Sequence, residues 1–206
     1  MTRLPATGDA LRALIRRHLA GFERVAAAGA ERRAAVAVTV LDLDTLPRVL
    51  VLKRAARGLN AGQWALPGGK LEPGEDAVAG ALRELAEEAG IRADPACVAG
   101  RLDDYLTASG FCITPVVVLA PPGARPERNA REVQSLHPIP LTRLLADGVP
   151  RWKPTADGER LLQMPLRHDM VVHAPTGAIL LQFREVALRG VELRIGDLRQ
   201  PEFTRR

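Results

Sequence analysis

The chain has 206 residues, which is enough for one domain with a sizeable hydrophobic core. Its hydrophobic content of 47% excludes a chain that is disordered by composition, and no apolar run approaches the roughly 20 residues of a membrane span. The net charge of +5 suggests an anionic partner, but the 29 basic residues are scattered and include only three lysines, which argues against a nucleic-acid-binding surface.

The N-terminal segment, residues 8–29, has the pattern of an amphipathic helix. Its apolar residues recur at three- and four-residue spacing: Leu11, Leu14, Ile15, Leu19 and Phe22. We expect residues 1–30 to form an N-terminal helical extension that packs on a domain of residues 31–206 or forms a dimer contact. The pattern of a secretory signal is absent, so we expect a cytoplasmic protein.

The next segments alternate between strand-like and turn-like composition. Residues 34–42 and 48–53 are rich in β-branched side chains and are predicted to be paired strands. A glycine-rich segment, RGLNAGQWALPGG, follows and is expected to contain a short strand at 64–66. It leads into an acidic helix.

Beyond that helix, residues 96–105 and 111–119 are predicted to be strands, and Pro115 predicts that the second is an edge strand or carries a bulge. Cys97 and Cys112 have no metal-type spacing and are predicted to be free thiols. Residues 121–129 are expected to be a loop, and 137–148 a short strand and a helix.

The tail begins with a proline-flanked region, residues 150–175. Residues 178–188 fit a helix or a strand, and 191–196 alternate like a strand. The whole pattern is typical of one αβα-type domain with additions at both ends.

The acidic helix has clear end signals. Asp76 is a good N-cap, and Gly90 suits the left-handed position after the last turn. The predicted apolar stripe consists of Val78, Ala81, Leu82, Leu85 and Ala89. Glu84, Glu87 and Glu88 are spaced i, i+3 and i+4, so they share the opposite face.

Three converging carboxylates need positive charge nearby. Arg83 can pair with Glu87, but the cluster still fits a site for divalent cations, since oxygen ligands with room for water and phosphate suit Mg²⁺. A glycine inside a helix costs about 1 kcal/mol against alanine. We interpret Gly80 as leaving space for a ligand close to the backbone. These features favour hydrolysis of a phosphoanhydride.

The segment from Gly69 to Ile91 resembles the Nudix box, G-x5-E-x7-R-E-U-x-E-E-x-G-U, where U is aliphatic. Every defined position is filled in this 23-residue stretch, GKLEPGEDAVAGALRELAEEAGI. The resemblance implies a Nudix α/β/α sandwich with a mixed β-sheet, extended by the N-terminal helix and a C-terminal segment. It also implies hydrolysis of a nucleoside diphosphate derivative that depends on Mg²⁺ or Mn²⁺.

The same resemblance implies metal binding by Glu84, Glu87 and Glu88, with the carbonyl of Gly69 as a further ligand. These three glutamates would also be the catalytic residues of the box.

Arg83 and Glu75 are expected to support the site, Arg83 by orienting the glutamates and Glu75 either by holding the loop or by reaching the metal shell through water. The general base is either a box glutamate or an acid outside the box. The candidate outside the box is Glu132, which otherwise is a charged residue on the surface of a loop. Asp103 and Asp104 could also approach the substrate.

The flanking segments resemble the coenzyme A pyrophosphatase branch of this family. The run SGFCITPVV at 109–117 matches S-G-[FY]-x-[VI]-T-P-V-V. Upstream, the chain keeps Arg54, Leu59 and Gly62 of that branch and departs from it at Ala55 and Asn60. The branch implies cleavage of coenzyme A or acyl-coenzyme A to 3′,5′-ADP and (acyl)phosphopantetheine.

Other readings stay open: ADP-ribose or another nucleoside diphosphate conjugate, a nucleoside triphosphate, or a non-catalytic ligand sensor. Arg54 and Lys70 are candidate phosphate contacts, and Trp64 either stacks on a base or packs in the fold. The C-terminal segment is expected to cover the active site or to build a homodimer. The expected partner is a small-molecule nucleotide, with no membrane.

Overall fold

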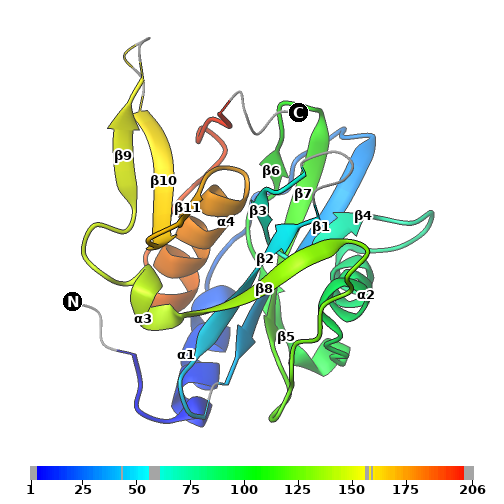
Figure 1. The fold of residues 1–206 in the computed structure, drawn as a ribbon, viewed down its shortest axis with the longest axis vertical. Helices are drawn as coiled ribbons and strands as arrows, with labels where there is room; N and C mark the ends of the chain where they lie inside the picture. Colours follow the sequence, from blue (N-terminus) through cyan, green and yellow to red (C-terminus); the bar gives the residue numbers. More distant parts are fainter. Residues whose placement is uncertain (1–3, 43, 56–60, 156–157, 159, 202–206) are drawn as a thin grey trace.

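The computed structural model describes residues 4–42, 44–55, 61–155, 158 and 160–201. Within these residues the centre of the fold is an eight-stranded sheet (Figure 1). Its strands are β1 (Arg32–Leu41), β2 (Arg48–Arg54), β3 (Trp64–Ala65), β4 (Gly68–Lys70), β5 (Val98–Arg101), β6 (Tyr105–Leu106), β7 (Phe111–Leu119) and β8 (Val133–Pro140). Strand β1 pairs with β7 in parallel and with β2 and β4 in antiparallel, so the sheet is mixed, as predicted.

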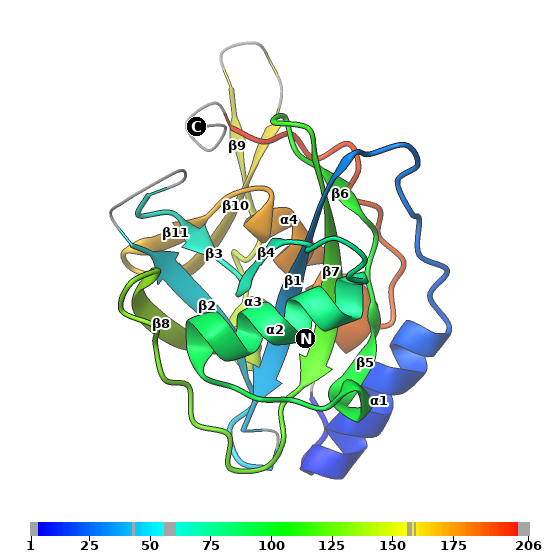
Figure 2. The same cartoon turned by 90° about the vertical axis from the view of Figure 1, so that its right-hand side faces the viewer.

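Helices cover both faces of this sheet (Figures 1 and 2). Helix α2 (Ala77–Ala89) packs on one face, and α1 (Gly8–Ala20) and α4 (Thr176–Gln182) lie on the other. Because side chains alternate along a strand, β1 supplies both cores: Ala35 and Ala37 to the α2 side, Val38 and Val40 to the other. The fold is the expected α/β/α sandwich.

The C-terminal region is more regular than its composition suggested. Residues 150–175, expected only as a proline-flanked region, carry a second, antiparallel sheet of β9 (Arg151–Pro154), β10 (Arg160–Arg167) and β11 (Met170–Val172). Helix α4 then continues into a π-helical stretch, η2 (Phe183–Leu188), so 178–188 is helical. Short helices η1 (Pro95–Cys97) and α3 (Leu141–Leu144) complete the elements.

The N-terminal helix is shorter than predicted. It ends at Ala20, and Gly21 caps it, whereas the prediction ran to residue 29. The backbone N–H of Val25 donates to Asp103 Oδ1 at 2.7 Å, and that of Ala27 donates to Asp104 Oδ2 at 3.0 Å. These tertiary hydrogen bonds take the place of hydrogen bonds within a helix. Long-range contacts therefore outweigh the helix propensity of this segment.

Three strand predictions need correction. Strand β5 covers only the middle of 96–105, and β8 begins at Val133 rather than near 137. Pro115 lies in β7, an interior strand, whose outer side pairs with β6 up to Ile113 and with β5 from Val116. The proline falls between these two partners, where the antiparallel pairing is interrupted.

Residues 191–196 form no strand, contrary to prediction. Their alternation has another cause: Ile195 is buried in the core, while Arg194 donates to Asp103 Oδ1 at 2.9 Å. Individual side-chain contacts, and not the hydrogen bonds of a strand pair, therefore hold this segment in place. Both cysteines are free, as expected. Among the described residues, no helix has the length and apolar character needed to cross a membrane.

Candidate active site

Helix α2 has the end structures that its sequence predicted. Asp76 accepts hydrogen bonds from the backbone N–H groups of Val78 and Ala79, both at 2.8 Å. Gly90 ends the helix with φ of 66°, in the left-handed region that glycine favours. Ala81, Leu85 and Ala89 are fully buried against the sheet, so the acidic side is turned away from the core.

Arg83 connects the acidic side chains on and near α2 through hydrogen bonds. Its Nε and NH2 groups donate to the two oxygens of Glu75 at 2.9 and 3.0 Å, a bidentate pair. Its NH1 group donates to Glu84 at 2.9 Å and to Glu87 at 3.0 Å. The guanidinium also holds the pKa of Glu75 below its ordinary value. The predicted Arg83–Glu87 pair is present.

Glu88 is a buried carboxylate at the end of this network. It is 1% exposed, and its Oε2 accepts a hydrogen bond from the backbone N–H of Gly68 at 2.9 Å. Arg54 NH1 lies 3.6 Å from Oε1. The pKa of Glu88 is raised to about 7, mainly by burial and also by the charges of Glu84 and Glu132, against the opposing effects of the Gly68 hydrogen bond and of Arg54.

Glu84 lies directly against the backbone of Gly69. A Cβ atom at this position would overlap with the Glu84 carboxylate, so the box needs a glycine here for close approach. Burial also raises the pKa of Glu84, and the charges of Glu87 and Glu132 act in the same direction. The Gly69 backbone is thereby placed beside a box carboxylate.

Glu132 comes from a different part of the chain, the turn before β8. It is exposed, and its backbone carbonyl accepts a hydrogen bond from Ala55 N at 2.9 Å. Its charge raises the pKa of both Glu84 and Glu88, which shows that the fold brings this carboxylate close to the box. The three acids share one neighbourhood, with Arg54 as a nearby cation.

The donor set suits a divalent cation in its chemistry. In the described residues no three carboxylates, imidazoles or thiols stand ready as a closed cage, because Arg83 holds Glu84 and Glu87 while Gly68 holds Glu88. Burial is the main cause of the raised pKa values of Glu84 and Glu88, and the charges of neighbouring carboxylates raise them as well. A hard cation with several waters would supply positive charge to this cluster, and Glu87, whose side chain is 52% exposed, would exchange its hydrogen bond to Arg83 for such a ligand.

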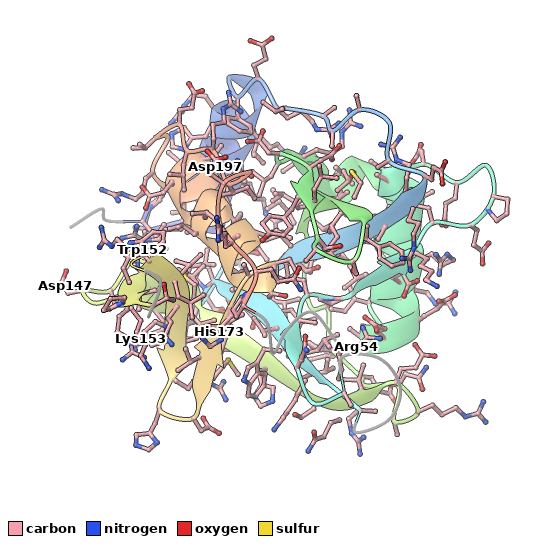
Figure 3. All side chains as sticks on the ribbon, turned by 90° about the horizontal axis from the view of Figure 1, so that it is seen from above. Arg54, Asp147, Trp152, Lys153, His173 and Asp197 are labelled. Atoms are coloured by element: carbon pink, nitrogen blue, oxygen red, sulfur yellow. The ribbon has the colours of Figure 1, made fainter. Side chains whose placement is uncertain are left out.

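A cavity of about 390 Å³ opens beside this cluster. Its floor comes from the sheet, and its opposite wall comes from the C-terminal segment around Val171–Thr176. Figure 3 shows Arg54 on the side of α2 and His173 on the side of the C-terminal elements. Arg54, Gly68 and Gly69 belong to both the cavity and the carboxylate cluster, so a ligand in the cavity would meet the acids along this rim.

The C-terminal wall was not identified residue by residue from the sequence. His173, Thr176 and Ile179 line the cavity, and no motif marks them. His173 Nε2 lies 3.1 Å from Gln163 Nε2, and burial lowers the pKa of His173. The general expectation that the tail covers the site nevertheless agrees with this wall.

Trp64 lines the cavity and also packs edge-on against His137, with ring centroids 4.9 Å apart. The packing role considered for it is present, and stacking on a base stays a prediction. Lys70 lies away from the glutamates, with its ammonium 5.6 Å from the centroid of Phe111. The motif residue Leu59, with Asn60, lies outside the described residues.

Two expectations are wrong. Asp103 and Asp104 are buried structural residues: Asp104 bonds Arg24 and Thr114, and Asp103 accepts from Gln182 Nε2 at 2.7 Å. Gly80 leaves no ligand space, because a side chain there would overlap with Leu71. A helical wheel places Gly80 near the acidic side but cannot show that the preceding loop fills the gap.

Comparison with known proteins gives a consistent result. A family model described as NUDIX domain matches residues 31–155. A protein of Photorhabdus laumondii named "Uncharacterized Nudix hydrolase NudL" is 35% identical over 116 residues, 56% of this chain and 62% of that protein. Its namesake from Yersinia pestis (strain Pestoides F) is 38% identical over 117 residues, 56% and 58% of the two chains. The match thus spans less than two thirds of either relative.

A crystal structure of a NUDIX hydrolase from Nitrosomonas europaea has the same fold. It aligns with a TM-score of 0.52 and 16% identity over 82% of this chain and 76% of that one. The family model ends before the second sheet and α4, so the wall at Val171–Thr176 lies outside the matched region.

Proposed function

Because the chain belongs to the Nudix hydrolase family, we propose that it is a metal-dependent pyrophosphohydrolase that cleaves the diphosphate of a nucleoside diphosphate derivative. One observation carries the proposal. The box helix presents Glu84 and Glu88 to the backbone of Gly68 and Gly69, at the rim of a cavity large enough for part of a nucleotide conjugate.

In this proposal Glu84, Glu87 and Glu88, with the carbonyl of Gly69, would hold Mg²⁺ or Mn²⁺. Held there, such ions would supply positive charge near the phosphates and make water a better nucleophile at neutral pH. Other side chains of the protein position these ligands. The bidentate Arg83–Glu75 pair fixes the guanidinium that orients the box glutamates.

Water then attacks one phosphorus in line with the leaving phosphate oxygen. Glu132, which reaches the cluster from outside the box, accepts the proton of the water; a box glutamate is the alternative base. Arg54 at the cavity rim contacts the diphosphate and stabilises the developing negative charge, and Lys70 is a further substrate contact.

For the substrate we propose coenzyme A or an acyl-coenzyme A. Cleavage would give 3′,5′-ADP and (acyl)phosphopantetheine, with one water consumed. The support is the run at 109–117, part of which builds β7 and supplies Ile113 to the cavity. The apolar lining, with Val36 from β1, Leu66 from the link between β3 and β4, and Ile179 from α4, suits an uncharged arm of the substrate. We further expect a cytoplasmic protein and test for a homodimer by sedimentation.

The test is a hydrolysis panel with Mg²⁺ and with Mn²⁺, products separated by chromatography. It contains coenzyme A, an acyl-coenzyme A, ADP-ribose, NADH, a dinucleoside polyphosphate and 8-oxo-dGTP. We expect 3′,5′-ADP from coenzyme A at a rate well above the others. A faster rate with ADP-ribose or the triphosphate would reject the coenzyme A assignment and keep the hydrolase.

Glu88→Gln serves as the inactive control and Glu23→Gln, at an exposed position in the N-terminal extension, as the matched substitution. We expect loss of turnover only in the first. No turnover of any compound by a protein that binds Mg²⁺ would instead indicate a ligand sensor.

A further inference from the structure

Two cations, Arg32 and Lys70, lie close to one aromatic ring, Phe111, on the strands that lead to the cavity. The Arg32 guanidinium carbon is 3.9 Å from the centroid of Phe111, and the Lys70 ammonium is 5.6 Å from it. Arg32 also donates to the carbonyl of Ser109 at 2.9 Å. The ring and this hydrogen bond hold the positive charges in place.

Strand register places this group in line with the cavity. Arg32 is the partner of Phe111, and Ala34 is the partner of both Ile113 and Lys70. Partners in a ladder point to the same face, as do residues two apart in a strand. Ala34 and Ile113 line the cavity. Both cations therefore lie on the cavity face: Lys70 is level with Ala34, on the neighbouring strand β4, and Arg32 is about 7 Å further along β1.

These positive charges lack neutralising partners. Within the described part of the chain, neither Arg32 nor Lys70 forms an ion pair, although the protein has many carboxylates. Both side chains are exposed. The box glutamates meet Gly69 from the opposite face, since Gly69 pairs with Ala35 of the α2 core. Positive and negative groups are thus separated across β4.

We propose that Arg32 and Lys70 bind a second anionic group of the substrate, a phosphate distinct from the diphosphate that is cleaved. This inference rests on the proposed function for the identity of the substrate as a nucleotide conjugate. A diphosphate bound at Arg54 and Gly69 would leave a further phosphate of the same molecule within reach of the cavity end. Arg32 selects conjugates that carry this extra charge.

The experiment measures binding by calorimetry and does not require turnover. The probes are AMP, 5′-ADP and 3′,5′-ADP in the presence of Mg²⁺. We compare the wild type with Arg32→Gln and with Arg33→Gln. Arg33 is the matched control, because it is the exposed next residue of β1 and points to the other face.

We expect 3′,5′-ADP to bind roughly tenfold tighter than AMP, the scale of one hydrogen bond to a charged group. Arg32→Gln should remove this preference, and Arg33→Gln should retain it. A gain for 5′-ADP that Arg32→Gln removes would place Arg32 on the diphosphate itself and overturn the proposal of a separate phosphate site. Equal binding of all three probes, or equal loss in both variants, would overturn the proposal.

The hydrolysis panel tests the hydrolase assignment independently of this binding experiment. If no compound is hydrolysed but the binding preference depends on Arg32, the hydrolase assignment fails while the anion site stands. If coenzyme A is hydrolysed and the coenzyme A to dephospho-coenzyme A ratio of kcat/KM is the same in both arginine variants, the anion site fails alone.

Discussion

Glu88 combines burial, a backbone hydrogen bond and a carboxyl pKa of about 7. In the unfolded chain the same carboxyl titrates near its ordinary value of 4.5. Between these two values the folded protein holds a proton that the unfolded chain has released. Ionisation therefore costs folded-state stability as the pH rises, and a bound cation would reverse that cost.

We expect the metal-free protein to lose thermal stability from about pH 4.5 to about pH 7, and Mg²⁺ to restore it most strongly at the upper end. Thermal melts at several pH values, with EDTA and with Mg²⁺, measure this. Glu88→Gln cannot ionise and should flatten the metal-free profile. A variant with the wild-type profile would show that other groups cause the pH dependence.

Glu132 is the candidate general base from outside the box. Alone in the sequence it is one charge in a polar turn, and the fold brings it to the box carboxylates. If it is the general base, Glu132→Gln should lower kcat about 10²-fold, the usual scale for that role, with little change in stability because the side chain is exposed. Steady-state kinetics measure this effect. A decrease in kcat of less than threefold would show that Glu132 is only a charged surface residue.

At the scale of elements, α2 is fixed mainly by its ends and by close backbone approach. Gly90 has φ of 66°, and a Cβ there would come 3.0 Å from the carbonyl oxygen of Glu127. The helix end therefore has both a conformational and a steric requirement, and it anchors the loop that leads to Glu132.

Gly90→Ala should destabilise the protein by about 1–2 kcal/mol through the left-handed conformation alone, with an added cost from the Glu127 contact. Gly74→Ala is the matched control, because Gly74 has φ of 80° and nothing within 4 Å of its Cβ position. Urea unfolding gives both values. Equal losses would mean that the Glu127 loop moves aside without cost.

At the scale of the whole molecule, the two chain ends are joined to the sheet through one buried carboxylate. Asp103 accepts from Val25 N in the N-terminal segment, from Gln182 in α4 and from Arg194 in the tail. The extensions are thus part of the folded unit. We propose to treat residues 31–206, with the 1–30 extension, as a single domain.

Asp103→Ala should cost about 3 kcal/mol or more, because it leaves Arg194 and Gln182 without their shared partner. Asp197→Ala, at an exposed position in the same tail, should change stability by less than about 0.5 kcal/mol. Thermal or denaturant unfolding compares them. A similar effect of both variants would contradict the anchoring role.

The sequence alone determined the fold family, the box helix and its capping residues, and the acids that share the side of the helix opposite its apolar stripe. These features depend on local spacing: Asp76, Gly90 and the i, i+3, i+4 glutamates act within a few turns of one helix. Such patterns are readable because the interacting residues are neighbours in the chain.

Only the tertiary structure decided what surrounds the box. The C-terminal wall at His173, the exclusion of Asp103 from the site and the filling of space at Gly80 by Leu71 all depend on contacts between distant or non-repeating segments. Hydrophobic pattern sets which face of a segment is buried, but not which segment covers it. That choice is made by packing over the whole sheet, where many weak contacts act together.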